Sequence, residues 1–129
     1  MVNEKNESKL LETLDSVAAS LESIALLRAI DMFYTREDRI ALLAEYRSLI
    51  DADHAAYADL QRAREADPER ELGWEARVEK YGEEEARKQN APVIALFEAK
   101  RETSEQHSRF GYKHPLIVDL YRKYPSVGQ

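Results

Sequence analysis

The sequence predicts an all-α protein, and both its composition and the spacing of its apolar residues support this prediction. Charged residues make up 34% of the 129 positions, and Glu, Arg and Lys alternate with Leu and Ala as they do in amphipathic helices. Gly and Pro occur only four times each, which is typical of a folded chain rather than a disordered one. A chain of this length falls within the size of one compact unit, so we expect residues 1–129 to form a single domain.

Two long amphipathic stretches occupy the first half of the chain. Apolar residues three and four positions apart predict a helix from Ser8 to about Tyr34, on a stripe formed by Leu10, Leu14, Val17, Leu21 and Ile24. A second stripe from Ile40 to near Ala66 contains Leu43, Tyr46, Leu49, Ile50, Tyr57 and Leu60. Between them Thr35 and Asp38 resemble a weak capping box, but no Gly or Pro enforces a break. The stripes therefore fit two helices or one continuous helix.

A proline marks each expected helix start in the second half. Asp67-Pro68 combines a capping side chain with a residue suited to the first helical turn, so a helix is predicted from Pro68 past Tyr81. Gly82 is able either to end that helix or to loosen it. Asn90-Ala91-Pro92 predicts a restart in the same way, for a helix that continues to about Ser108.

The last twenty residues are expected to hold a turn and one short helix. Residues 110–113 are predicted as the turn. His114-Pro115 then starts a helix through Leu116, Ile117, Leu120 and Tyr121, which Pro125 ends.

Composition also restricts location and partners. The chain has no cysteine, which excludes disulfides and thiolate metal sites, and no apolar N-terminal segment of the secretory type, so we expect a cytoplasmic protein. No apolar run approaches the roughly 20 residues that a membrane span needs. A net charge of −6 disfavours nucleic acid as a partner. A small anion remains possible, because two or three convergent Arg side chains bind a carboxylate even in an acidic protein.

General searches for catalytic and metal-binding motifs identify only weak patterns. Asp51 and His54 share a helical face, but no second helix supplies matching ligands, so no metal site is predicted. The spacing from Arg47 to His54 fits the R-x(4 to 6)-H pattern of HEPN ribonucleases. Two other Arg and His pairs fit that pattern equally well, namely Arg101 with His107 and Arg109 with His114.

Four segments, read together, resemble a known family. Leu42-Leu43-Ala44-Glu45-Tyr46-Arg47 is similar to the "LLAER" stretch of AroQ-type chorismate mutases, and Asp67-Pro68-Glu69-Arg70-Glu71 is similar to the "DPERE" that opens their second helix. Leu96-Phe97, followed by Ser104 and Gln106, resembles their third helix, and Leu27-Arg28-Ala29-Ile30-Asp31 resembles a shortened "LRxxID". The resemblance covers a core of about residues 24–108 and leaves residues 1–23 and 109–129 as N- and C-terminal helical extensions.

This resemblance implies a fold and a reaction. The fold is a helical bundle with a very long first helix, in which Thr35 lies mid-helix, and the subunits form an intertwined homodimer. The reaction is the isomerisation of chorismate to prephenate, a step of aromatic metabolism that needs no cofactor. Catalysis then depends on holding a folded substrate and stabilising charge at the breaking ether bond.

The resemblance also assigns residues to the site. Arg70 would bind a carboxylate, Glu71 a hydroxyl group, and Arg28 would come from the partner subunit. Tyr46 stands where the family has a second carboxylate-binding Arg, and Tyr57 where it has the catalytic Lys. The full catalytic set is Arg28, Arg70, Glu71, Tyr57, Ser104 and Gln106, and the substrate-binding set is Arg47, Asp67 and Tyr46.

Two other functions fit the same residues. Asp-Pro-Glu-Arg-Glu is also an ordinary helix start, and solitary Arg side chains are often simply solvated. The chain would then be a non-catalytic acidic interaction protein, such as an inhibitor, immunity protein or assembly factor. The third function is a HEPN-like helical ribonuclease that depends on Arg47 and His54.

Overall fold

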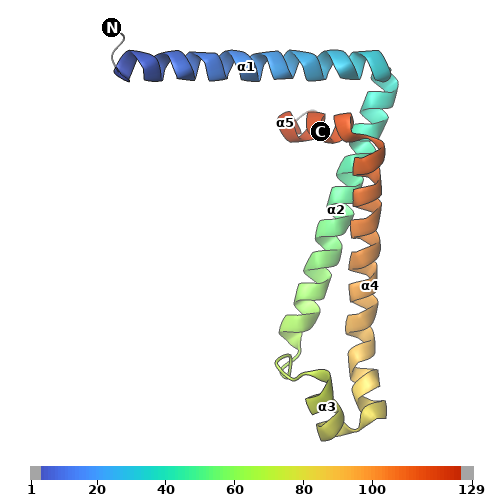
Figure 1. Cartoon of the computed structure of the whole chain (residues 1–129). Helices are drawn as coiled ribbons and strands as arrows, with labels where there is room; N and C mark the ends of the chain where they lie inside the picture. The colour runs from blue at the N-terminus through green and yellow to red at the C-terminus, as the bar shows by residue number, and fades with distance from the viewer. Residues whose placement is uncertain (1–3, 126–129) are drawn as a thin grey trace. The chain divides into compact units, whose positions relative to one another are not determined.

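A computed structural model describes residues 4–125, and all the regular structure in that range is helical. The five helices are α1 (Glu4–Phe33), α2 (Arg36–Ala66), α3 (Trp74–Tyr81), α4 (Glu83–Lys113) and α5 (Pro115–Lys123), as Figure 1 shows. The prediction of an all-α protein is confirmed.

Contacts divide the chain into two compact units. Among the described residues, the first consists of residues 4–44 and 114–125, and the second of residues 45–113. The first unit therefore contains α1, the start of α2 and α5, and the second contains the rest of α2 with α3 and α4.

Aliphatic side chains form the core of the first unit. Ile30 on α1, Leu43 on α2 and Ile117 on α5 are almost fully buried, and Val118 and Leu120 of α5 join them. The prediction of a short last helix is confirmed, with Pro115 in its first turn. Just before it, the His114 ring accepts or donates a hydrogen bond with the Tyr34 hydroxyl over 3.2 Å.

The chain breaks between α1 and α2 at Tyr34 and Thr35. The Asp38 amide donates a 3.1 Å hydrogen bond to the Thr35 hydroxyl, which satisfies one of the free amides at the start of α2. Arg39 forms an ion pair with Asp31 over 2.8 Å across the break. Thr35 therefore caps the start of α2 with its side chain, as the weak capping-box pattern suggested, and the placement of Thr35 in the middle of one long helix is wrong.

The second unit pairs α2 with α4, which run side by side in opposite directions (Figure 1). Near one end of the pair Tyr46 stacks on Phe110 with ring centroids 5.2 Å apart. Residues 110–113 form the last helical turn of α4, so the loop predicted there is wrong. The physical reason is that buried Phe110 anchors this segment against α2.

Two of the helix starts that were predicted at proline residues are also wrong. Residues 68–71 form a turn rather than a helix, and α3 begins only at Trp74. Pro92 lies inside α4. That helix starts instead after Gly82, whose φ of +86° favours glycine, and the acidic residues Glu83, Glu84 and Glu85 suit the positive end of the helix dipole.

Candidate functional site

The connection from α2 to α3 is a turn organised by Asp67. The Arg70 amide donates to the Asp67 carbonyl over 3.3 Å, and the Leu72 amide donates to the Glu69 carbonyl over 2.9 Å. The Asp67 carboxylate accepts the Glu69 amide over 2.9 Å. Asp67 therefore caps a local turn, as Asp residues commonly do, in place of the predicted helix.

Arg77 of α3 fixes this turn from the inside. Its guanidinium donates to the Asp67 carboxylate over 2.8 Å and to the Glu69 carbonyl over 2.9 Å. The side chain is 11% exposed, which leaves the charge largely desolvated and dependent on these acceptors. Arg77, followed by the Glu69 amide, lowers the pKa of Asp67 below its usual value, so the pair stays ionised.

Glu69 makes a second set of polar contacts on the exposed side of the turn. It accepts hydrogen bonds from the Lys80 ammonium and the Tyr81 hydroxyl, both at the end of α3. Lys80, and then Tyr81, lowers the pKa of Glu69, and Glu69 in turn raises the pKa of Lys80. Two residues of the turn, Asp67 and Glu69, therefore bind side chains of α3.

A cavity of about 300 Å³ opens at this junction. Its lining combines three Arg side chains with two carboxylates and one indole, and the residues are Arg64, Asp67, Arg70, Glu71, Leu72, Trp74, Arg77, Asn90 and Val93. The cationic groups outnumber the carboxylates, although the whole chain is acidic. We name this feature the junction cavity.

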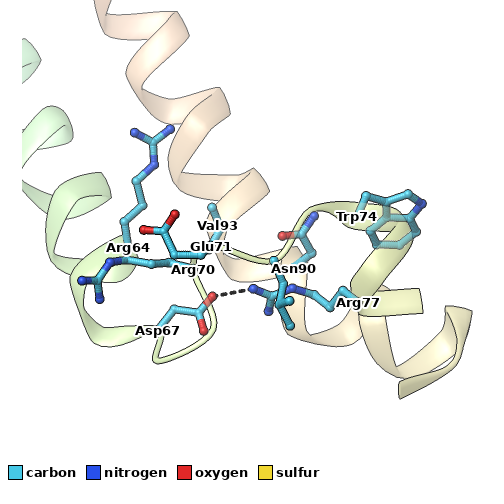
Figure 2. Close-up of a pocket in the computed structure, with 9 residues that line it drawn as sticks. Arg64, Asp67, Arg70, Glu71, Trp74, Arg77, Asn90 and Val93 are labelled. Carbon is cyan, nitrogen blue, oxygen red and sulfur yellow. Dashed lines mark hydrogen bonds and ion pairs between the residues drawn. The ribbon is translucent and has the colours of Figure 1, made fainter. Parts of the chain in front are cut away.

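Figure 2 shows how the cationic groups of the junction cavity lie. Arg77 turns toward Asp67, whereas the Arg64 and Arg70 side chains extend in different directions. The Arg64 guanidinium lies over the Phe97 ring, 5.1 Å from its centroid. Among the described residues neither Arg64 nor Arg70 forms an ion pair with a carboxylate, so both charges are available to an anion.

Three of the residues predicted for the site, Asp67, Arg70 and Glu71, line the junction cavity together. Sequence reasoning missed Arg64, Trp74 and Arg77. Arg64 lies one turn before Asp67, a spacing that could have been noticed. The burial of Arg77 had no signal in the sequence, because most Arg side chains are exposed.

Ser104 belongs to a different cluster, which joins the middle of α2 to α4. Its hydroxyl donates to the Asp53 carboxylate over 2.9 Å, and Thr103 donates to the same oxygen over 3.0 Å. Lys100 donates to Asp53 over 2.9 Å and to Ser104 over 2.6 Å. Lys100, first among these donors, lowers the pKa of Asp53. We name these four residues the Asp53 cluster.

The remaining predicted residues of the second unit lie on α2 and α4 outside the junction cavity. Tyr46 is buried at 3% exposure, with its hydroxyl 3.2 Å from a His107 ring nitrogen. Tyr57 is exposed, and its hydroxyl accepts a 2.6 Å hydrogen bond from Gln61. Arg47 is half-buried on α2, and Gln106 is exposed on α4.

Arg28 lies in the first unit, exposed on α1. His54, the other member of the ribonuclease-like pair, is exposed on α2. Within residues 4–125, no group of three or more acidic or His side chains is placed to hold a metal ion. In the same range no helix has both the length and the apolar character needed to cross a membrane.

Comparisons of this chain with protein-family models, curated proteins and solved structures give no significant match.

Proposed function

We propose that the chain is a chorismate mutase-like protein that binds chorismate or a related anionic cyclic metabolite in the junction cavity. The observation that carries the proposal is that Asp67, Arg70 and Glu71, the residues of the "DPERE"-like segment, line one cavity. A volume of about 300 Å³ lies at the lower end of the range for small-molecule sites.

Six of the nine lining residues have a role in this proposal. Arg70 binds a carboxylate through two parallel N–H donors, and Arg64 supplies a second cation. Glu71 accepts a hydrogen bond from a ring hydroxyl, and the indole of Trp74 offers an apolar surface to the ring. Asp67 acts indirectly, because its ion pair with Arg77 holds the turn that carries Arg70.

We expect turnover of a bound ligand to be slow, because the lining lacks a cation suited to the chemical step. A mutase-type isomerisation needs no cofactor but benefits from a cation at the breaking ether bond. No Lys is among the lining residues, and Lys100 is held in the Asp53 cluster. Both Arg64 and Arg70 must also turn toward the ligand, and ordering these long side chains weakens binding. The proposal includes the cytoplasmic location and the homodimer expected from the sequence.

The test is a titration of the purified protein with chorismate and with prephenate. Heat and the fluorescence of Trp74, the single tryptophan, report binding, and ultraviolet absorbance reports loss of chorismate. We expect Arg70→Ala to weaken binding by about tenfold or more, because it removes a charge-assisted pair of hydrogen bonds.

Arg109→Ala is the matched control. Arg109 belongs to the same unit, is 80% exposed on α4 and does not line the junction cavity. It should bind ligand as the wild type does. The proposal would be overturned if the wild-type protein bound neither ligand at millimolar concentration. It would also be overturned if Arg70→Ala and Arg109→Ala weakened ligand binding equally.

A second candidate function, the non-catalytic interaction protein, is favoured by one observation. Helix α1 presents a row of apolar side chains that remain more than half exposed, such as Leu10, Leu14 and Leu21. Under this alternative, Arg70→Ala leaves every activity intact, and changes on α1 abolish partner binding.

A further inference from the structure

Helix α1 carries a row of large apolar side chains that stay exposed within the part of the chain that the structure describes. Six large side chains between residues 10 and 24 keep 51% to 62% of their surface exposed, namely Leu10, Leu11, Leu14, Val17, Leu21 and Ile24. Five of the six follow the alternating spacing of four and three residues that marks the a and d positions of a heptad. With Leu14 and Leu21 at a, Leu10, Val17 and Ile24 occupy d.

The positions beside this row carry no charge. The e and g positions between residues 10 and 27 hold only Leu, Ala, Thr and Ser, in the set Leu11, Thr13, Ala18, Ser20, Ala25 and Leu27. The three charged residues of the stretch, Glu12, Asp15 and Glu22, fall at the b and f positions on the opposite side. We name the a, d, e and g positions from Leu10 to Leu27 the α1 face.

We infer that the α1 face binds the α1 face of a second copy of this chain in an antiparallel helix pair. The charge pattern favours a second copy as the occupant. A chain with a net charge of −6 repels its own copies wherever acidic groups meet. On the α1 face there are none, so like-charge repulsion does not oppose self-association there. This inference assigns a surface to the homodimer of the proposed function, but it does not depend on the junction cavity and is tested separately from it.

The available area meets what such an interface needs. Eighteen residues of helix are about 27 Å long, and half the surface of a cylinder about 12 Å across then amounts to on the order of 500 Å². Two copies would bury about 1,000 Å² together, which is the lower limit for a specific interface. We therefore expect a reversible dimer rather than a permanent one.

The position of Arg28 selects the antiparallel direction. Arg28 occupies the next a position after Leu21. In a parallel pair it would face Arg28 of the other copy in the same layer, which is unfavourable. In an antiparallel pair centred near residue 19, Leu14 packs opposite Ile24 and Val17 opposite Leu21, which gives four central apolar layers.

The same register places Arg28 at the edge of the pair. There it lies opposite Leu10 of the second copy and about one turn from that copy's Glu7. The Arg28 stem can cover Leu10 while its guanidinium reaches the carboxylate. The inference thus assigns Arg28 to the helix pair.

Sedimentation equilibrium of the full chain tests the association. We expect a monomer–dimer equilibrium in the wild type, and a dissociation constant raised by about 100-fold or more in Leu21→Glu, which buries two unpaired carboxylates per dimer. Ala19→Glu adds the same charge at an f position, outside the α1 face, and should leave the equilibrium unchanged. Far-ultraviolet circular dichroism checks that both variants keep their helices.

Single cysteines test the direction, because the natural chain contains none. In the antiparallel pair, the two Ser20 residues lie close together across the axis, and the two Leu10 residues lie about 27 Å apart. Under mild oxidation Ser20→Cys should form a disulfide-linked dimer and Leu10→Cys should not. A wild type that stays monomeric at several hundred micromolar, a dimer that Leu21→Glu leaves intact, or cross-linking through Leu10→Cys instead of Ser20→Cys would overturn the inference.

Discussion

The two units of this protein are stabilised by different kinds of contact. In the first unit, the buried residues Ile30, Leu43, Ile117, Val118 and Leu120 are all aliphatic. Such packing depends on shape and on apolar area removed from water, and not on any charge state. The contribution of this aliphatic core to stability should therefore change little with pH.

The second unit depends more on charged groups. Its buried set includes Arg77, and two polar clusters connect its elements, one around Asp67 and Arg77 and the other around Asp53 and Lys100. Each cluster centres on a carboxylate whose pKa is lowered by the cation beside it. Removing a buried charge should therefore affect the second unit, whose apolar core also includes Tyr46 and Phe110, more than the first.

The largest effect is expected from a cavity in the first unit. Ile117→Ala removes a fully buried side chain where α5 packs, and should cost about 3 kcal/mol. Amide hydrogen exchange on the full chain measures the loss, which should appear in α5 and the end of α1 while α3 keeps its protection.

Ile94→Ala is the control for Ile117→Ala. Ile94 is 49% exposed on α4, so its truncation leaves no cavity and should change protection by less than about 1 kcal/mol. If Ile117→Ala weakened both units equally, the separation of the two kinds of core would be wrong.

A smaller effect is expected from removing the buried cation of the second unit. Arg77→Met keeps most of the side-chain volume but leaves Asp67 and the Glu69 carbonyl without their donor, at a cost of about 2 kcal/mol. Trp74 opens α3, so denaturation followed by tryptophan fluorescence reports this region directly.

Arg77→Lys tests whether the stability of the turn depends on the charge of Arg77 or on the geometry of its guanidinium. An ammonium retains the charge but cannot reach two acceptors in the fixed arrangement of a guanidinium, so we expect stability between that of the wild type and Arg77→Met. Equal stability of all three proteins would show that the turn does not depend on this network.

Much of the fold could be predicted from the sequence because helix periodicity is a local signal. Residues only a few positions apart are enough to predict the apolar stripes of α1 and α2 and the start of α5 at His114-Pro115. The errors at Pro68 and Pro92 have one cause. Proline suits a first helical turn, but it is also found in turns and inside long helices, and the sequence signal is the same in each case.

The candidate site shows a similar division. Asp67, Arg70 and Glu71 are near neighbours in the sequence, so one motif identified them together. Arg77 and Lys100 acquire their contacts from tertiary structure, since Arg77 meets Asp67 across ten positions and Lys100 meets Asp53 across 47. Periodicity does not predict which exposed-type side chains such packing buries.

The smallest effect concerns the Asp53 cluster, and it tests the pH difference between the units. The pKa of Asp53 is lowered in the folded protein, chiefly by Lys100, so its contribution to stability is present above the unfolded value of about 3.9 and is lost as the pH falls through the folded value. Asp53→Asn should cost about 1.5 kcal/mol at pH 7, because the amide oxygen accepts the same donors less strongly. As the pH falls below about 4, the wild type should lose this advantage and approach Asp53→Asn.

Hydrogen exchange in α2 and α4, compared with α5 of the same molecules, measures the difference at each pH. A constant gap between wild type and Asp53→Asn down to pH 2 would contradict the assignment, because it would mean that the cluster does not depend on the Asp53 charge.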